Sequence, residues 1–219
     1  MSTDGRATRW AQHREDRRRE LVSATLRAIR VHGASVALDE IAARAGTSKT
    51  VIYRHFGDRA GLYEAVVDAV HAYIHAGLMD TVTRGPRAGL HTFVTDLTDA
   101  YLALVERDVE IYRFVMTPPA SSGGGDPAGD LPRIIGTQVG EALARHGGID
   151  AARARIWGTG LMGCIRATAD LWMTQQPRPP RADVVEAVSA LLTPGLVALE
   201  HPTGHAAPPA VTASAFAPQ

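Results

Sequence analysis

Residues 38–56 constrain the fold of this chain most, because their pattern predicts two short helices joined by a tight turn. In the first helix, apolar side chains recur at helical spacing, namely Leu38, Ile41, Ala42 and Ala45. Gly46 predicts the turn, since glycine adopts left-handed backbone angles without steric strain. Ser48 can cap the second helix by accepting a hydrogen bond from a free amide in its first turn.

The second helix of this pair has an apolar back and a polar front. At about 100° per residue, Ile52 and Phe56 point one way, whereas Thr50 and Arg54 point the other way. A short helix with cations and hydroxyls on one face fits the major groove of duplex DNA. The sequence therefore predicts a helix-turn-helix.

Residues 21–63 resemble the N-terminal domain of TetR/AcrR-type bacterial transcriptional regulators. The matching residues are Leu21, Ala24, Gly33, Ile41, Ala42, Ala45, Gly46, Ser48, Tyr53, His55, Phe56, Arg59 and Leu62. The resemblance implies that Tyr53 and His55 bind phosphates and that Arg59 lies at the start of the next helix.

Three positions depart from the usual pattern of that family. Ala37 stands where a helix-capping threonine is common, so the side-chain cap and the phosphate contact of that threonine are not expected here. Arg59 replaces the commoner lysine and keeps the positive charge, and Ala34 stands where an aromatic residue is usual. The family assignment does not depend on any of the three.

We expect one set of residues to contact DNA: Ser48, Lys49, Thr50, Tyr53, Arg54, His55 and Arg59. Thr50, Lys49 and Arg54 are expected at or near base edges, because they lie on the polar front of the second helix. The other four are expected on phosphates, which position a protein on the duplex without reading its sequence.

The charge is divided unevenly, although the formal net charge of the 219 residues is zero. Residues 1–60 hold 12 Lys+Arg and 7 Asp+Glu, whereas residues 61–219 hold 11 and 16. This division suits a DNA-binding domain on an acidic remainder, although chance can also produce it. The arginine-rich residues 1–16 are expected to form a flexible arm, either simply disordered or adding phosphate or minor-groove contacts.

The rest of the chain predicts helices without a convincing strand or repeat, so we expect an all-α fold of about nine helices. The expected units are a flexible arm over 1–16, a helix-turn-helix domain over 17–63 (the head), a helical domain over 64–200 (the body) and a disordered tail over 201–219. The expected helices outside residues 38–56 cover 17–32, 59–77, 86–106, 109–116, 131–145, 150–174 and 182–199. Residues 117–130 are expected to form a loop, since they are rich in proline, glycine and serine.

The last two predicted helices, over 150–174 and 182–199, are expected to form a homodimer interface. The first carries small residues that let helices approach closely: Gly158, Gly160, Gly163, Ala167 and Ala169. The second offers an apolar stripe: Val184, Val188, Leu191, Leu192 and Leu196. The resemblance implies a four-helix bundle between two subunits, whereas the alternative is that both stripes are ordinary monomer core.

The body also carries aromatic and methionine residues that suggest a hydrophobic or acyl-type effector site. The candidates are Phe93, Leu97, Tyr101, Tyr112, Phe114, Val115, Met116, Trp157, Leu161, Met162 and Trp172. Residues of this kind are also ordinary core, and the resemblance favours the effector site. Arg166 lies one turn from Asp170, and it could hold an effector carboxylate or phosphate if that face is turned inward.

The sequence argues against an enzyme or a metalloprotein. It has no G-x-S-x-G motif, no phosphate-binding glycine loop and no Glu-x-x-His pair. Cys164 is the only cysteine, and His71 and His75 have no third ligand at a matching spacing, so we expect no disulfide, metal or cofactor. No signal peptide or membrane-spanning run is visible, so we expect a cytoplasmic protein without a membrane partner.

The leading functional hypothesis is a repressor that binds a near-palindromic DNA operator as a dimer and is released by a small effector. An activator or an effector-independent regulator fits the same residues, because the operator position decides between them. A helical small-molecule carrier or enzyme is the remote alternative. Binding to duplex DNA that falls steeply with salt would favour a regulator over a carrier.

Overall fold

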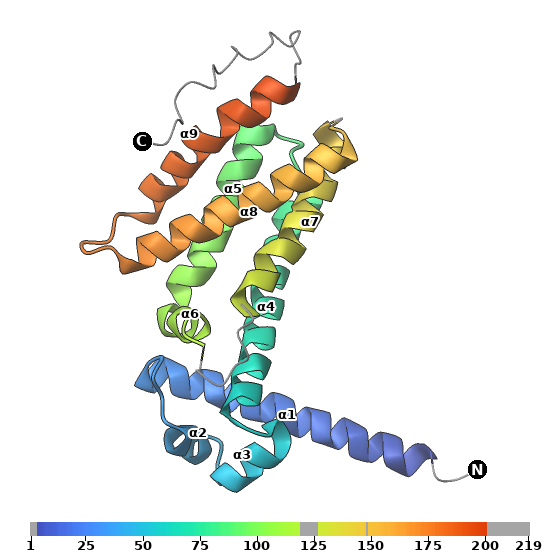
Figure 1. Cartoon of the computed structure of the whole chain (residues 1–219), viewed down its shortest axis with the longest axis vertical. Coiled ribbons are helices and arrows are strands. Elements are labelled where there is room, and N and C mark those ends of the chain that lie inside the picture. The colour runs from blue at the N-terminus through green and yellow to red at the C-terminus, as the bar shows by residue number, and fades with distance from the viewer. Residues whose placement is uncertain (1–3, 119–126, 148, 201–219) are drawn as a thin grey trace, which may run out of the picture.

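The computed structural model describes residues 4–118, 127–147 and 149–200, and the regular structure in them is entirely helical (Figure 1). The helices are α1 (Asp4–His32), α2 (Leu38–Arg44), α3 (Lys49–Phe56), α4 (Arg59–Arg84), α5 (Leu90–Arg107), α6 (Val109–Val115), α7 (Pro127–Gly147), α8 (Ala151–Thr174) and α9 (Arg181–Glu200). The predicted all-α class is confirmed. Within the described residues, no helix combines the length and apolar content that crossing a membrane requires.

The head lies at one end of the long axis and the body at the other, and α4 runs through both (Figure 1). In the head, α1 contributes Leu21 and Ile29 to a small core, α2 contributes Ile41, and α3 contributes Ile52 and Phe56. Each of these side chains is less than a tenth exposed. The two apolar stripes predicted for residues 38–56 therefore face this core, and they fix which side of α3 points outward.

The turn and caps around α3 follow the predicted chemistry. Gly46 has a φ of +60°, the left-handed conformation that ends α2. Ser48 Oγ accepts a hydrogen bond from the amide of Val51 (3.4 Å), which caps α3. Ala37 offers no side-chain acceptor at the start of α2, but Glu40 Oε2 accepts from the Ala37 amide (2.8 Å). One of the two bonds of a capping box is thus present, and the Glu40 amide, which a threonine side chain would bind, donates to the Ala37 carbonyl oxygen (3.1 Å).

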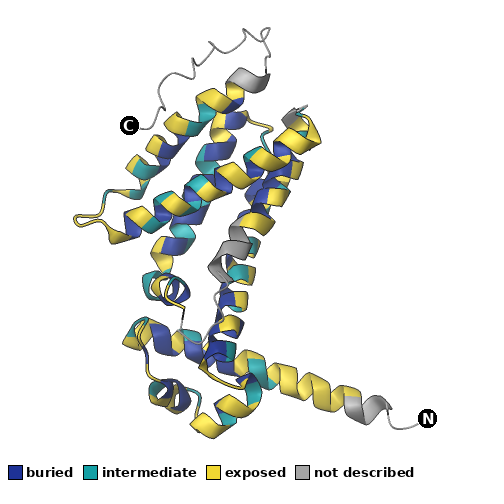
Figure 2. Ribbon diagram, in the orientation of Figure 1, coloured by how far each residue is buried: buried dark blue, intermediate teal, exposed yellow. Residues whose placement is uncertain are grey.

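Helix α1 starts at Asp4, so the expectation of a flexible arm over 1–16 is wrong from that residue onward. The segment is rich in arginine and also carries two alanines, Gln12 and Glu15, and all of these residue types favour helices. Close side-chain pairs add to this preference, including Arg19 with Asp16 (2.5 Å) and Gln12 with Asp16 (3.2 Å). Residues 8–16 of α1 are exposed, and this part of the helix extends past the head (Figures 1 and 2).

Several predicted helix ends differ from those in the structure. Helix α4 continues past Gly77 to Arg84, and it ends at Gly85, whose φ is +60°. Helix α5 starts at Leu90 rather than at Pro86, which lies in the preceding turn. Helix α7 starts at Pro127, since proline is well tolerated in a first turn. Residues 119–126 of the predicted loop and the predicted tail over 201–219 lie outside the described residues.

The body is built of α4, α5 and α7–α9, with α6 beside the head (Figure 1). Helices α7 and α8 approach each other most closely, because Gly136 and Gly140 on α7 face Gly158 on α8. A Cβ atom on Gly158 would lie 2.1 Å from the carbonyl oxygen of Gly136. Gly158 therefore serves packing inside the subunit, contrary to its expected place in a dimer interface. A Cβ atom added to Gly160 or Gly163 of the same helix would meet nothing within 4 Å on the other described elements.

Candidate nucleic-acid interface and effector pocket

Helix α3 presents its polar side to solvent. Lys49, Thr50 and Arg54 are exposed, and Tyr53 is 43% exposed. Because Ile52 is buried in the head core on the opposite side, α3 cannot rotate without exposing apolar surface. Four of the expected DNA-contacting residues thus form one fixed, exposed face, namely Lys49, Thr50, Tyr53 and Arg54, whereas His55 is half-buried.

Lys49 is held by an acid from the neighbouring helix. Its Nζ atom lies 2.7 Å from Asp39 Oδ1 of α2, and both side chains are well exposed. An exposed pair of this kind contributes little to stability. The ammonium group can therefore exchange this carboxylate for a stronger acceptor at small energetic penalty.

His55 lies in a strongly cationic environment. Burial lowers the pKa of its imidazole, and the charges of Arg54, Arg17, Arg18 and Arg14 lower this pKa further. The imidazole is therefore neutral near pH 7, and it can donate one hydrogen bond to an anion without carrying charge. A phosphate brought into this cluster would meet several guanidinium groups.

Arg18 of α1 contacts the C-terminal end of α3. Its Nη1 atom donates to the carbonyl oxygen of His55 (2.7 Å), and its guanidinium lies 4.5 Å from the centroid of the Phe56 ring.

Arg59, at the start of α4, donates to the carbonyl oxygen of Val36 (3.2 Å). One of the five donors of Arg59 therefore serves the head itself, and the exposed remainder of the group can still bind an anion.

Sequence reasoning missed a groove between α1 and α3, which we call the basic groove. Its wall consists of Trp10, His13, Arg14 and Arg17 from α1 with Thr47, Val51, Arg54 and His55 from the other side. It exists only because residues 4–16 are helical. The helix-favouring composition of that segment was the signal, but its arginine content and scarce apolar residues indicated disorder instead.

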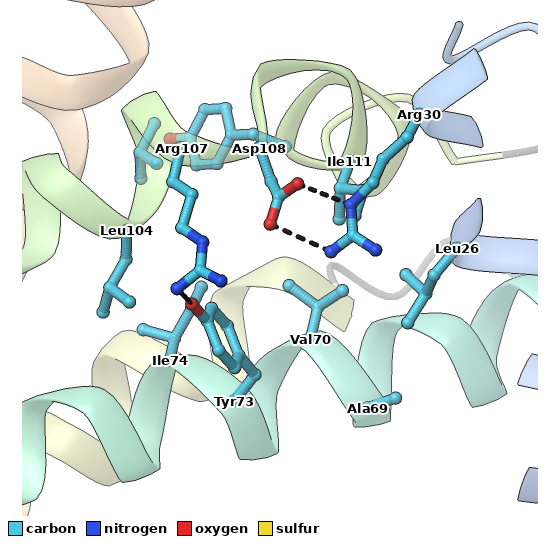
Figure 3. Close-up of a pocket in the computed structure, with 12 residues that line it drawn as sticks. Leu26, Arg30, Ala69, Val70, Tyr73, Ile74, Leu104, Arg107, Asp108 and Ile111 are labelled. Carbon is cyan, nitrogen blue, oxygen red and sulfur yellow. Dashed lines mark hydrogen bonds and ion pairs between the residues drawn. The ribbon is translucent and has the colours of Figure 1, made fainter. Parts of the chain in front are cut away.

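A second concave site, which we call the joint pocket, lies where α1, α4, α5 and α6 meet (Figure 3). Its volume is about 150 Å³. Tyr112 belongs to its wall and is the one expected effector residue among the described residues that line it. Most other expected effector residues are buried in the body core, namely Phe93, Leu97, Tyr101, Phe114, Val115, Leu161, Met162 and Trp172, whereas Met116 and Trp157 are half-buried.

The expected anion-holding residue, Arg166, is already paired. Its Nε atom lies 3.8 Å from Asp170 Oδ2, and its side chain is 20% exposed. The hydroxyl of Tyr112 donates a hydrogen bond to the same carboxylate. The structure therefore assigns Arg166 an internal partner, and an effector anion would have to displace Asp170 to reach it.

His71 and His75 have the spacing of a metal-binding pair, and His75 is engaged with a residue of α7. A hydrogen bond joins His75 Nε2 to Gln138 Oε1 (2.9 Å). Within the part of the chain that the structure describes, no three histidine, cysteine or acidic side chains cluster so as to hold a metal ion.

Comparisons with known proteins agree with this arrangement. Residues 21–66 match the family described as bacterial regulatory proteins, tetR family. Residues 84–207 match the family described as tetracyclin repressor-like, C-terminal domain. The chain belongs to the TetR family of bacterial transcriptional regulators. This family consists of DNA-binding regulators rather than enzymes.

Individual relatives support the same assignment over most of the chain. The uncharacterized HTH-type transcriptional regulator Rv0472c of Mycobacterium tuberculosis is 33% identical over 196 residues, which cover 87% of this chain and 82% of that protein. The HTH-type transcriptional activator FasR of Mycolicibacterium smegmatis is 28% identical over 185 residues, 79% of this chain and 80% of its own length. A TetR-family regulator from Streptomyces coelicolor shares the fold, with a TM-score of 0.64 at 21% identity, over 85% of this chain and 82% of its own.

Proposed function

We propose that this TetR-family chain is a ligand-responsive repressor that binds a near-palindromic operator as a homodimer. The observation that carries the proposal is the exposed row of Lys49, Thr50 and Arg54 on α3, held in place by buried Ile52 and Phe56. A cationic and hydroxyl-bearing helix face with a fixed orientation is suited to base edges in a major groove.

The remaining expected contacts are proposed to bind phosphates. Tyr53 supports this role through its exposed ring and hydroxyl, and His55 through its neutral imidazole among arginines. Arg59 adds a charge at the start of α4, where the free amides of the helix also favour an anion. The Ser48 hydroxyl oxygen accepts the capping hydrogen bond of α3. Because this bond uses only the oxygen as acceptor, the hydroxyl proton can still be donated to a phosphate.

The basic groove extends the proposed contact surface beyond α3. Arg14 and Arg17 lie on the same groove as Arg54, on a helix that the head anchors from Leu21 onward. A rigid helix loses less conformational entropy on binding than a disordered arm does. We therefore propose that the first half of α1 binds phosphates as a helix, which replaces the expected flexible arm.

The proposed dimer uses an exposed apolar stripe of α8 and the exposed Leu191 of α9, because Val188 and Leu196 of the predicted α9 stripe are buried inside the subunit. On α8 the stripe includes Ile156 (71% exposed) and Leu171 (60% exposed), with Gly160 and Gly163 between them. On α9, Leu191 is 70% exposed. Large apolar side chains exposed in line on adjacent helices are typical of protein interfaces. A two-fold dimer would then present two heads to two half-sites about one DNA turn apart.

An activator is the second candidate function. The relative FasR, which is 28% identical, is named as a transcriptional activator. The head that binds DNA is the same in both cases, and the operator position relative to the promoter decides the outcome. A reporter gene driven by the native upstream region distinguishes them: deletion of the regulator raises expression for a repressor and lowers it for an activator.

Selection from a random duplex pool tests the proposed function directly. The full-length protein should enrich a two-fold symmetric sequence, and its affinity for that duplex should fall linearly with the logarithm of salt concentration. Failure to enrich any sequence, together with salt-independent binding, would contradict the proposal and would favour a carrier.

A further inference from the structure

The joint pocket has the size and the lining of a site for a small apolar group. Its volume is about 150 Å³, and its apolar wall includes Leu26 of α1, Val70 and Ile74 of α4, Leu104 of α5 and Ile111 of α6 (Figure 3). A space of about 150 Å³ holds one molecule of the size of benzene. The joint pocket opens to solvent, because Arg30, Tyr73 and Arg107 of its lining are exposed. Its apolar part therefore suits a single ring or a short branched chain.

Charged side chains line the same pocket and carry a net positive charge. Arg30 donates to both carboxylate oxygens of Asp108, at 2.6 and 3.0 Å. Arg107 donates instead to the neutral hydroxyl of Tyr73 (2.9 Å). Among the residues that the structure describes, Arg107 forms no ion pair, and its charge acts on Asp108 only from beyond ion-pair distance. Two guanidinium groups thus face one carboxylate, which leaves one positive charge unmatched.

We propose that the joint pocket binds a small monocarboxylate with a one-ring or short branched apolar body. The apolar body enters among Leu26, Val70 and Ile111, and the carboxylate pairs with the guanidinium of Arg107. Arginine suits this role because its planar donors match the two oxygens of a carboxylate. In Figure 3 the Arg107 side chain extends toward Tyr73 of α4, along the lining of the pocket.

The place of the pocket gives its occupant a regulatory role, and this part of the inference rests on the proposed function. Leu26 and Arg30 belong to α1 of the head, whereas Leu104 and Asp108 belong to the body. A ligand that touches both sides binds best when α1 and the body keep one relative position. Ligand binding therefore shifts the population of head orientations, since the affinity of the pocket for the ligand differs between those orientations.

Calorimetric titration of the full-length protein with benzoate and with 3-methylbutanoate, a short branched carboxylate, tests the site without DNA. We expect saturable binding of at least one of the two, and the neutral benzyl alcohol should bind at least tenfold more weakly than benzoate. Arg107→Gln should weaken carboxylate binding at least tenfold and leave benzyl alcohol binding unchanged. The matched control is Arg145→Gln, an exposed arginine of α7 paired with Glu141, which should change neither.

Ala69→Leu provides a second variant, because it adds three carbons to the wall without removing a charge. It should weaken the binding of benzoate and benzyl alcohol alike. Absence of saturable binding of both carboxylates to the wild-type protein would overturn the proposal. Equal carboxylate affinity in the wild type and in Arg107→Gln would overturn it as well.

The regulatory part is tested by the affinity for the selected duplex with and without saturating benzoate. We expect a change of fivefold or more in the wild type and none in Arg107→Gln. An unchanged affinity in the wild type, while calorimetry shows binding, would overturn the regulatory role. Loss of DNA binding under all conditions would instead refute the proposed function and leave the calorimetric test of the pocket intact.

Discussion

The hydroxyl of Tyr112 donates a hydrogen bond to the carboxylate of Asp170, which joins α6 to α8 inside the body. Tyr112 also lines the joint pocket, and it lies close enough to Tyr101 of α5 to influence the pKa of that residue. Asp170 in turn pairs with Arg166 (3.8 Å). This polar cluster connects α6, which lies beside the head, with α8, which carries the proposed dimer stripe. A displacement of α6 would therefore act on α8 through these polar contacts.

The same cluster predicts a loss of stability at alkaline pH. Burial raises the pKa of Tyr101 to about 12, and the charge of Asp170 contributes to this increase. The unfolded chain releases this proton near pH 10, so between about pH 10 and about pH 12 the folded state binds more protons than the unfolded state. Stability is therefore fully present below pH 10 and is lost as the pH rises through the folded pKa.

Urea unfolding, followed by circular dichroism, measures this loss. From about pH 9 to about pH 11 the free energy of unfolding should fall by about 1.4 kcal/mol through Tyr101 alone. Tyr101→Phe should lack this component of the decrease, whereas Tyr73→Phe, at a 41% exposed position, should retain it. Parallel pH profiles for wild type and Tyr101→Phe would contradict the prediction.

The two classes of contact proposed for α3 predict different losses of DNA affinity. Tyr53→Phe removes one proposed phosphate contact and should weaken binding to the selected duplex and to random duplex alike, by about 1 kcal/mol. Thr50→Ala should reduce the discrimination between bases at one operator position by about 1–3 kcal/mol. Fluorescence anisotropy with a panel of single-base variants separates the two, and uniform losses for both substitutions would refute these roles.

The basic groove predicts that α1 contributes to the salt dependence of binding. Arg14→Gln should reduce the slope of log affinity against log salt by about 0.9, the value for one lost phosphate contact. Arg19 is the matched control, because it lies outside the basic groove and pairs with Asp16. An equal slope for Arg14→Gln and wild type would show that the groove does not touch DNA.

How far the sequence predicts this molecule depends on whether a segment carries its own pattern. The stripe with Ile52 and Phe56 and the glycine at position 46 fixed the orientation of α3, because local chemistry decides both. The joint pocket had no such signature, since Leu26, Arg30 and Arg107 come together only through tertiary packing. Helix formation over residues 4–16 was missed because its high charge and scarce apolar residues are also typical of disordered segments, although arginine favours helices.

The proposed dimer stripe predicts a change of oligomeric state on a single charge insertion. Leu191→Glu places a carboxylate at a position that is 70% exposed in the subunit, so the fold itself should persist. Burying that charge without a partner in a dimer interface would be strongly unfavourable. Analytical ultracentrifugation should show dimers for wild type and monomers for the variant, with unchanged circular dichroism. Monomers for both proteins would remove the basis of the proposed dimer.

The glycines of α8 predict opposite effects on stability from the same substitution. Gly158→Ala would bring a methyl group to 2.1 Å from a backbone oxygen of α7 and should destabilise the subunit by at least about 3 kcal/mol, because backbone cannot give way as a flexible side chain does. Gly163→Ala meets no atom within 4 Å of its new carbon and should stabilise α8 by up to about 1 kcal/mol. Urea unfolding at several protein concentrations separates this gain from any effect on the dimer. Equal losses for the two variants would mean that Gly163 is packed as tightly as Gly158.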